Sequence, residues 1–209
     1  MNFVNTEQQP TEKNQLSKGL TVPSAADKAP GYLENLKFLI VDDNAFMRSI
    51  VKNVLNSLDA RYFREAADGA EALKILQSGF TPDIAIVDWE MKPLDGIELV
   101  QMIRTAPDSA NPFLPIIMLS GHSEVSRVLQ ARDAGVNEFV VKPISVKSLF
   151  SRIDSLINKP RKFIRAGSFF GPDRRRRTID VGISDRRGEA APDQSQSLTT
   201  DQVSELLAQ

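Results

Sequence analysis

Residues 83–96 read DIAIVDWEMKPLDG, and within this stretch an apolar run gives way abruptly to turn-forming residues. The run from Ile84 to Val87 has the β-branched, almost continuous apolar character of a strand buried in a parallel sheet. Pro93 and Gly96 then require a loop. Asp88 is therefore predicted at the carboxyl end of a strand, where open α/β sheets bind ligands. A carboxylate there acts as a metal ligand, as a nucleophile or as a cap of the following helix.

A second apolar run, residues 36–41, ends in Asp42 and Asp43 just before a helix predicted over residues 44–58. These acids converge with Asp88 if the two strands are neighbours. Three carboxylates within a few ångströms repel one another unless a cation is bound, and such an oxygen-rich site suits Mg²⁺. Taken alone, Asp43 is also explained as a cap of the helix.

Two further apolar runs end in groups that hold phosphate oxygens. Residues 115–119 lead into Ser120, and residues 138–141 lead into Lys142. A hydroxyl donates hydrogen bonds to such oxygens, and an ammonium is a compact positive charge that offsets carboxylates. Individually, a Ser after a strand is an ordinary turn residue and a Lys before Pro is an ordinary solvated one. The indication therefore comes from the four strand ends together.

Helical patterns separate these strands. Helices are predicted to start at Asp68, Asp95, Ser123 and Ser145, and the first two of these residues are followed three positions later by Glu. The alternation of strands and helices predicts an α/β fold in which a parallel sheet carries helices on both faces.

The order and spacing of these strand ends resembles the receiver domain of two-component response regulators, above all the chemotaxis-type single-domain regulators. The resemblance covers about residues 36–158. The matching residues are Val41-Asp42-Asp43, Met47-Arg48, Ala67-Asp68-Gly69, Asp88-Trp89, Met91, Pro93, Asp95-Gly96, Ser120-Gly121, Gly135 and Val141-Lys142-Pro143. It implies a doubly wound, five-stranded parallel sheet in the flavodoxin-like order 2-1-3-4-5.

The same resemblance implies a phosphoacceptor site. Asp88 would take a phosphoryl group from phosphohistidine on a histidine kinase or phosphotransfer protein and become an aspartyl phosphate, with Lys142 and Ser120 as the other two catalytic residues. Mg²⁺ would be bound by the carboxylates of Asp43 and Asp88 and by the backbone carbonyl of Glu90. Asp42 would bind it directly or through a water. Apart from this self-phosphorylation and a slow self-dephosphorylation, no enzyme activity is expected.

The resemblance also implies a conformational switch made of Ser120 and Phe139. Ser120 would move toward the phosphoryl group, and the space that it leaves would let Phe139 turn inward. The alternative is that Phe139 is simply a core aromatic of an edge strand. Trp89, beside the acceptor, is expected to report on the site by its fluorescence.

Glu90 and His122 depart from the family pattern at positions that tune the lifetime of the phosphoryl group. Three roles are open for Glu90: it repels a phosphodonor, it binds a water of the metal site, or it pairs with protonated His122. A solvated surface pair is the alternative.

Composition limits what else the chain does. Its 209 residues predict one or two domains, and a formal net charge of −1 gives no overall footprint for nucleic acid. With no Cys and a single His, disulfides and Cys- or His-rich metal sites are excluded. Residues 1–35 are expected to be a disordered leader without a signal peptide, and no apolar run is long enough for a membrane span, so a cytoplasmic protein is expected.

Residues 159–209 form a C-terminal extension of different character. From residue 159 to 189 ten Lys or Arg face four acids, and aromatic residues lie among them. The candidate interacting residues are Phe169, Phe170, Arg174, Arg175, Arg176 and Arg177. They would bind nucleic acid, an anionic membrane or an acidic protein face, or the segment folds back and places Phe169 and Phe170 on the receiver itself. Residues 199–209 predict a short amphipathic helix that is marginal unless it docks.

Two functions follow. The first is a phosphorylation-controlled module that acts on a protein target through its fourth helix, fifth strand and fifth helix. The second is a regulator that binds nucleic acid through the Arg-rich tail.

Overall fold

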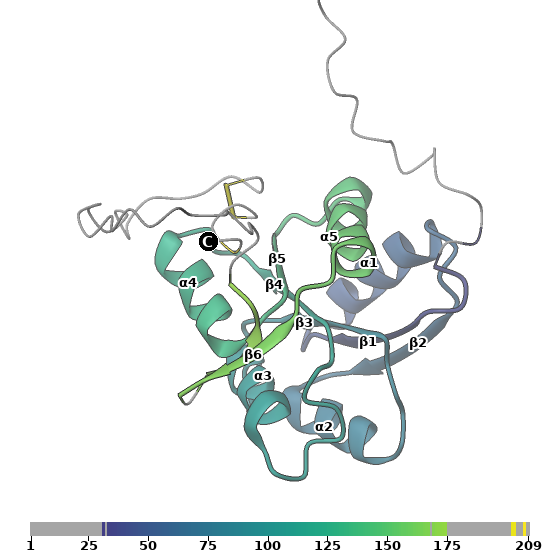
Figure 1. The fold of residues 1–209 in the computed structure, drawn as a ribbon. Coiled ribbons are helices and arrows are strands. Elements are labelled where there is room, and N and C mark those ends of the chain that lie inside the picture. The colour runs from purple at the N-terminus through teal and green to yellow at the C-terminus, as the bar shows by residue number, and fades with distance from the viewer. Residues whose placement is uncertain (1–30, 32, 168, 175–201, 204–206, 208–209) are drawn as a thin grey trace, which may run out of the picture.

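The computed structural model describes residues 31, 33–167, 169–174, 202–203 and 207. Five parallel strands form one sheet in the order β2-β1-β3-β4-β5, with helices on both faces (Figure 1). The fold class and strand order predicted from the sequence are confirmed. The elements of this sheet are β1 (Lys37–Val41), α1 (Ala45–Asn56), β2 (Tyr62–Ala66), α2 (Gly69–Gln77), β3 (Ile84–Asp88), α3 (Gly96–Thr105), β4 (Ile116–Ser120), α4 (Val125–Ala134), β5 (Glu138–Val141) and α5 (Val146–Asn158).

The strand register brings the predicted strand ends to one edge of the sheet. Val41 at the end of β1 pairs with Val87 of β3, and Asp88 pairs with Leu119 of β4. Ser120 in turn pairs with Val141 of β5. β3 and β4 are buried along their whole length, as expected for central strands of a parallel sheet.

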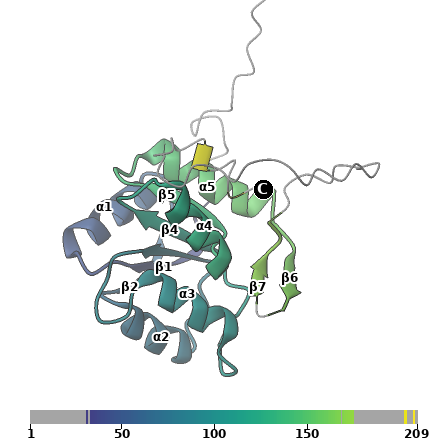
Figure 2. The same ribbon diagram turned by 90° about the vertical axis from the view of Figure 1, so that its left-hand side faces the viewer.

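Each face of the sheet has its own apolar core. On one face α1 and α5 pack their buried residues against the sheet, among them Val51, Leu55, Leu149 and Ile153. On the other face α2, α3 and α4 form the second core, which reaches to Trp89 beside the acidic strand ends. Figure 2 shows the sheet edge-on between these helix layers.

Side-chain caps fix most helix starts. Asn44, not Asp43, caps α1, since its Oδ1 accepts hydrogen bonds from the backbone N–H groups of Phe46 and Met47. This leaves Asp43 free of the capping role that was its alternative explanation. Asp68, Asp95 and Ser145 cap α2, α3 and α5 as predicted.

The predicted start of α4 at Ser123 is wrong. The helix begins at Val125, and the residue at its N-cap is Glu124, which makes no side-chain capping bond. The Glu124 carboxylate instead contacts His122, with Oε1 3.5 Å from Nδ1. Since the side chain that could cap α4 is turned toward the preceding loop, the start of α4 lacks the stabilisation that the other helices have.

The chain after α5 folds back onto the domain as an antiparallel hairpin, β6 (Phe163–Ala166) and β7 (Phe169–Pro172). Its Phe163 and Phe170 rings pack edge-on against the ring of Phe113, with centroids 5.3 and 5.2 Å apart, and tilted against each other at 5.7 Å. β7 lies against α3 and α4, as Figures 1 and 2 show. The sequence predicted a fold-back as one alternative but not strands.

Arg104 joins this hairpin to the rest of the fold. Its guanidinium is buried and donates hydrogen bonds to the backbone carbonyls of Pro112, Leu114 and Gly135 and to the side chain of Asn137, at 2.8–3.0 Å. It also lies 5.0 Å from the centre of the Phe163 ring. Burial lowers the pKa of Arg104 to about 9, so the group stays charged at neutral pH.

At the end of the chain, Gln202 and Val203 lie in a helical turn, and the N–H of Leu207 donates to the carbonyl of Val203. Within the described part of the chain, no helix has both the length and the hydropathy that crossing a membrane requires. Most of the leader predicted over residues 1–35 lies outside the described residues. The same holds for all three of Arg175, Arg176 and Arg177.

Candidate phosphoacceptor site

Three carboxylates meet at the carboxyl edge of the sheet, as the strand ends predict. Asp42 and Asp43 follow β1, Asp88 is the last residue of β3, and one oxygen of each lies within 4.8 Å of the others. Asp42 and Asp88 are buried, whereas Asp43 is exposed. This cluster is open to solvent on the side of Asp43 and closed on the side of the sheet.

Lys142, which follows β5, reaches across β4 into the cluster. Its Nζ lies 2.9 Å from Oδ1 of Asp88 and 3.3 Å from Oδ2 of Asp42. One ammonium thus contacts two buried carboxylates. With Asp43 included, the cluster carries three negative charges against one positive charge.

Burial and the neighbouring charges both shift the pKa values of Asp88 and Lys142. Burial raises the pKa of Asp88 above its ordinary value, and the neighbouring Asp42 adds to the increase, while the hydrogen bond and charge of Lys142 oppose it. Burial alone would lower the pKa of Lys142, but the hydrogen bond and charge of Asp88 and the charge of Asp42 outweigh burial and raise it. Two neighbouring anions stabilise the charged form of Lys142, whereas Asp88 has one neighbouring cation and one neighbouring anion.

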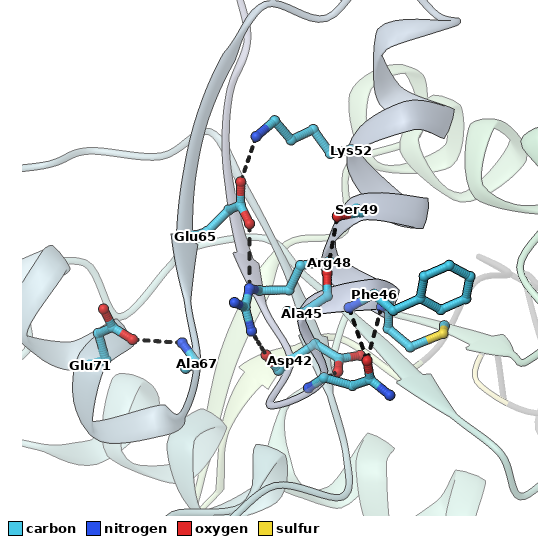
Figure 3. A network of polar contacts seen from close by, with 11 residues as sticks. Asp42, Ala45, Phe46, Arg48, Ser49, Lys52, Glu65, Ala67 and Glu71 are labelled. Atoms are coloured by element: carbon cyan, nitrogen blue, oxygen red, sulfur yellow. Dashed lines mark hydrogen bonds and ion pairs between the residues drawn. The ribbon is translucent and has the colours of Figure 1, made fainter.

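Backbone and side-chain contacts hold Asp42 in place. Its Oδ1 accepts from the N–H of Asn44 at 2.8 Å, and its carbonyl accepts from Arg48 at 2.8 Å. Arg48 is itself paired with Glu65, which also binds Lys52 at 2.6 Å (Figure 3). The hydrogen bond from Lys52 is the main reason that the pKa of Glu65 is lowered. The sequence matched Arg48 to the family but did not predict this supporting role.

Ser120 completes the ring of strand-end groups. It is buried at the end of β4, its Oγ accepts a hydrogen bond from the N–H of His122 at 3.0 Å, and its carbonyl accepts from the N–H of Lys142 at 2.7 Å. The same strand edge thus supplies three carboxylates, one hydroxyl and one ammonium. This is the set of groups that phosphoryl transfer to a carboxylate requires.

Phe139 lies in β5, two strands from the acceptor, and is fully buried. Its ring packs edge-on against Trp89, with centroids 6.3 Å apart and an interplanar angle of 72°. The structure therefore holds Phe139 in the inward position that was expected to follow a movement of Ser120. Its role as a switch stays a prediction.

Glu90 and His122 are in contact beside the site. Oε1 of Glu90 lies 3.0 Å from Nε2 of His122, and the other ring nitrogen faces Glu124. Of the roles open for Glu90, pairing with His122 is the one that these distances support. The role of the Glu90 carbonyl as a metal ligand stays a prediction.

The cluster fits a magnesium ion by its chemistry. All of its anionic donors are carboxylate oxygens, which Mg²⁺ prefers, and they come from adjacent strand ends rather than from a closed cage. The excess of negative over positive charge is what a divalent cation balances. The residues that would hold it are Asp42, Asp43 and Asp88.

Comparison with known proteins agrees with this geometry. Residues 38–154 match the response regulator receiver domain family, and the matched stretch is more than half of the chain. The chain belongs to that family. Receiver domains are signalling modules and not enzymes with diffusible substrates.

Chemotaxis regulators are among the relatives of this receiver. It is 36% identical to chemotaxis protein CheY-3 of Vibrio cholerae over 126 residues, which are 60% of this chain and 95% of that protein. It is also 36% identical to chemotaxis protein CheY of Pseudomonas aeruginosa over 124 residues, 59% of this chain and 98% of that protein.

Solved structures show the same likeness. CheY4 of Vibrio cholerae is 29% identical, with a TM-score of 0.53 over 58% of this chain and 98% of that one. A CheX–CheY–BeF3–Mg²⁺ complex from Borrelia burgdorferi is 26% identical, with a TM-score of 0.51 over 58% of this chain and 88% of that one. The extension after α5 lies beyond the family match.

In the described part of that extension, aromatic and basic residues contact each other. Arg174 lies 4.3 Å from the centre of the Phe169 ring and pairs with Asp133 of α4 at 3.2 Å. Arg165 lies 4.7 Å from the centre of the Phe170 ring. Phe169, Phe170 and Arg174 therefore make contacts within the chain, as the fold-back alternative requires.

The raised pKa of Asp88 predicts how stability depends on pH. An acid whose pKa is raised on folding stabilises the fold below its ordinary pKa of 3.8 and loses that contribution as pH rises through the folded value. We expect Asp88→Asn to unfold at a temperature a few degrees higher than the native chain at pH 7 without Mg²⁺. The difference should shrink toward pH 4, as measured by thermal unfolding. Equal midpoints at pH 7 would contradict a destabilising charge on Asp88.

Proposed function

We propose that this receiver is a response regulator that takes a phosphoryl group from a histidine kinase or phosphotransfer protein onto Asp88 and thereby controls a protein partner. The observation that carries the proposal is the contact of Lys142 with Asp88 and Asp42 at the edge where the acids and Ser120 meet. The absence of a membrane span among the described helices fits a cytoplasmic location, which belongs to the same proposal.

The transfer needs little covalent chemistry from the protein. An oxygen of Asp88 attacks the phosphorus of phosphohistidine, the P–N bond breaks, and the imidazole leaves while an acyl phosphate forms. Lys142 holds one oxygen of the transferring group and offsets its charge. The hydroxyl of Ser120 donates to another oxygen once it turns from its contact with His122. A bound Mg²⁺ would supply further neutralisation of the phosphoryl oxygens.

We infer that Glu90 and His122 set the lifetime of the acyl phosphate. Their contact joins the loop after β3 to the loop after β4, beside Asp88. We infer that this contact limits the approach of water to the phosphoryl group. His122→Ala should then shorten the lifetime of the acyl phosphate several-fold. An unchanged rate of dephosphorylation would show that the contact between Glu90 and His122 does not set this lifetime.

Trp89 gives a direct test of metal and phosphoryl binding. It is the single Trp of the chain, it follows Asp88, and it is buried against Phe139. We expect Mg²⁺ to change its fluorescence saturably, and a small-molecule phosphodonor such as acetyl phosphate to change it further only when Mg²⁺ is present. Stopped-flow fluorescence measures both steps.

Two variants serve as controls for this experiment. Asp43→Asn should weaken the Mg²⁺ response, because it removes one of three carboxylates while leaving the buried pair intact. Asp88→Asn should abolish the response to phosphodonor. A phosphodonor response that survives in Asp88→Asn would show that the acceptor lies elsewhere.

Nucleic-acid binding by the Arg-rich tail is the second candidate, and the basic composition of residues 159–189 favours it. The contacts of Phe169 and Phe170 with Arg174 and Arg165 count against it, because rings used this way are not free to stack on bases. Binding of labelled single-stranded DNA that falls steeply with salt would favour this candidate.

A further inference from the structure

The end of the chain is part of the receiver's core. Val203 and Leu207 are both fully buried, and they belong to the apolar core on the α2–α4 side of the sheet. Gln202, the neighbour of Val203, is exposed. The described residues thus have the pattern of one helical turn whose apolar side faces the domain.

This turn lies on the surface between α4 and α5. In Figure 1 the short yellow segment at residues 202–203 lies between α4 and α5. The same core contains Val125 and Val128 of α4 and Phe139 of β5. On the α5 side, Nη1 of Arg161 donates to the carbonyl of Leu207 at 2.9 Å.

The surface under the turn is connected to the phosphoacceptor. Phe139 lies in the same core and packs against Trp89, which directly follows Asp88. Arg127 of α4 lies 4.9 Å from the centre of the Trp89 ring. A movement of Phe139 or of α4 would therefore disturb the same apolar core that Val203 and Leu207 join.

The contact is of a kind that exchanges easily. Val203 and Leu207 contribute burial of apolar side chains, a non-directional interaction that another apolar segment of similar shape can replace. α4 has no side-chain cap at its start, so the helix beneath the turn is the one least fixed at its N-terminus. Because the segment belongs to the same chain as the receiver, its effective concentration at this surface is high.

We propose that the segment that carries Val203 and Leu207 is an internal ligand of the surface formed by α4, β5 and the end of α5, and that a protein target must displace these two residues to bind there. The role of this segment in signalling rests on the proposed function. The chemistry of the internal ligand defines the partner segment, which is an amphipathic helix with apolar residues four positions apart. The segment thus acts as an autoinhibitor of the output surface.

The test uses the full chain and a labelled peptide of residues 199–209. Val203→Asp should free the surface, since it places a charge where the side chain is fully buried, and Gln202→Asp adds the same charge at the exposed neighbour. By fluorescence anisotropy, the peptide should bind the Val203→Asp chain about tenfold or more tighter than it binds the native or Gln202→Asp chains. Circular dichroism and Trp89 emission verify that both variants are folded.

Hydrogen exchange gives a second readout that needs no peptide. Amides of α4 should exchange faster in Val203→Asp than in the native chain and be unchanged in Gln202→Asp. Equal exchange in all three folded chains, or equal peptide binding by them, would overturn the inference. Neither measurement involves phosphodonor, so the two proposals can fail separately. If the chain is phosphorylated on Asp88 but fails both tests, the inference of an internal ligand is wrong and the proposed function still holds.

Discussion

Arg104→Ala is expected to lower the free energy of unfolding by about 3–5 kcal/mol, because each of the carbonyls of Pro112, Leu114 and Gly135 then loses a buried hydrogen-bond donor at a cost of about 1 kcal/mol or more. The contact of the guanidinium with the Phe163 ring is lost as well. Chemical denaturation followed by circular dichroism measures the change.

Arg61→Ala is the matched control for this substitution. The guanidinium of Arg61 pairs with Glu34, but this side chain is 64% exposed. Its removal should change stability by less than about 1 kcal/mol. If Arg104→Ala were no more destabilising than Arg61→Ala, the buried guanidinium would not be the link between hairpin and domain.

Gly96→Ala is expected to cost about 3 kcal/mol and to weaken Mg²⁺ binding at the same time. Gly96 is the first residue of α3, and its N–H donates to the carbonyl of Trp89 at 3.0 Å. A Cβ at this position would overlap the backbone carbonyl of Asp88 and stand 3.0 Å from Cα of Trp89. The helix can make room only by pushing on the residue that carries the acceptor carboxylate.

Gly121→Ala tests whether this effect comes from the close approach. Gly121 also lies beside the site, after Ser120, but a Cβ there meets nothing within 4 Å. Denaturation and Mg²⁺ titration of both variants should show a loss in Gly96→Ala alone. A Gly96→Ala chain with native stability and native Mg²⁺ affinity would show that the backbone has more freedom at this point than the structure gives it.

The site was predictable because of the geometry of parallel sheets. Asp42, Asp88, Ser120 and Lys142 each follow an apolar run, and parallel strands put their carboxyl ends on one edge, so sequence position alone brought these groups together. β2 was predicted only from the alternation of elements. As an edge strand it alternates exposed Tyr62 and Arg64 with inward residues and has no apolar run to identify it.

The extension was harder to predict, because its strands depend on partners distant in sequence. In the sequence, Phe163 and Phe170 are simply aromatic residues in a basic segment. In the structure they belong to a hairpin that packs against Phe113 and Arg104 of the receiver. The backbone of β7 also comes close to the end of α4, since a Cβ on Gly171 would stand 2.9 Å from Cα of Gly135. Nothing in the local sequence predicts this approach.

The misplaced start of α4 has a similar cause. Ser123 is a good N-cap by residue type, but the loop after β4 is shaped by contacts of its neighbours, the N–H of His122 with Ser120 and the ring of His122 with Glu90 and Glu124. Loop geometry set by the site overrides local capping preference.

Locating the phosphoryl group by mass spectrometry tests the central claim most directly. The native chain is incubated with acetyl phosphate and Mg²⁺, and its intact mass and peptides are compared with those of Asp88→Asn and of the native chain in chelator. We expect one added phosphoryl group, found on the peptide that contains Asp88 and missing in both controls. A folded native chain that gains no phosphoryl group, or carries it on another residue, would contradict the account.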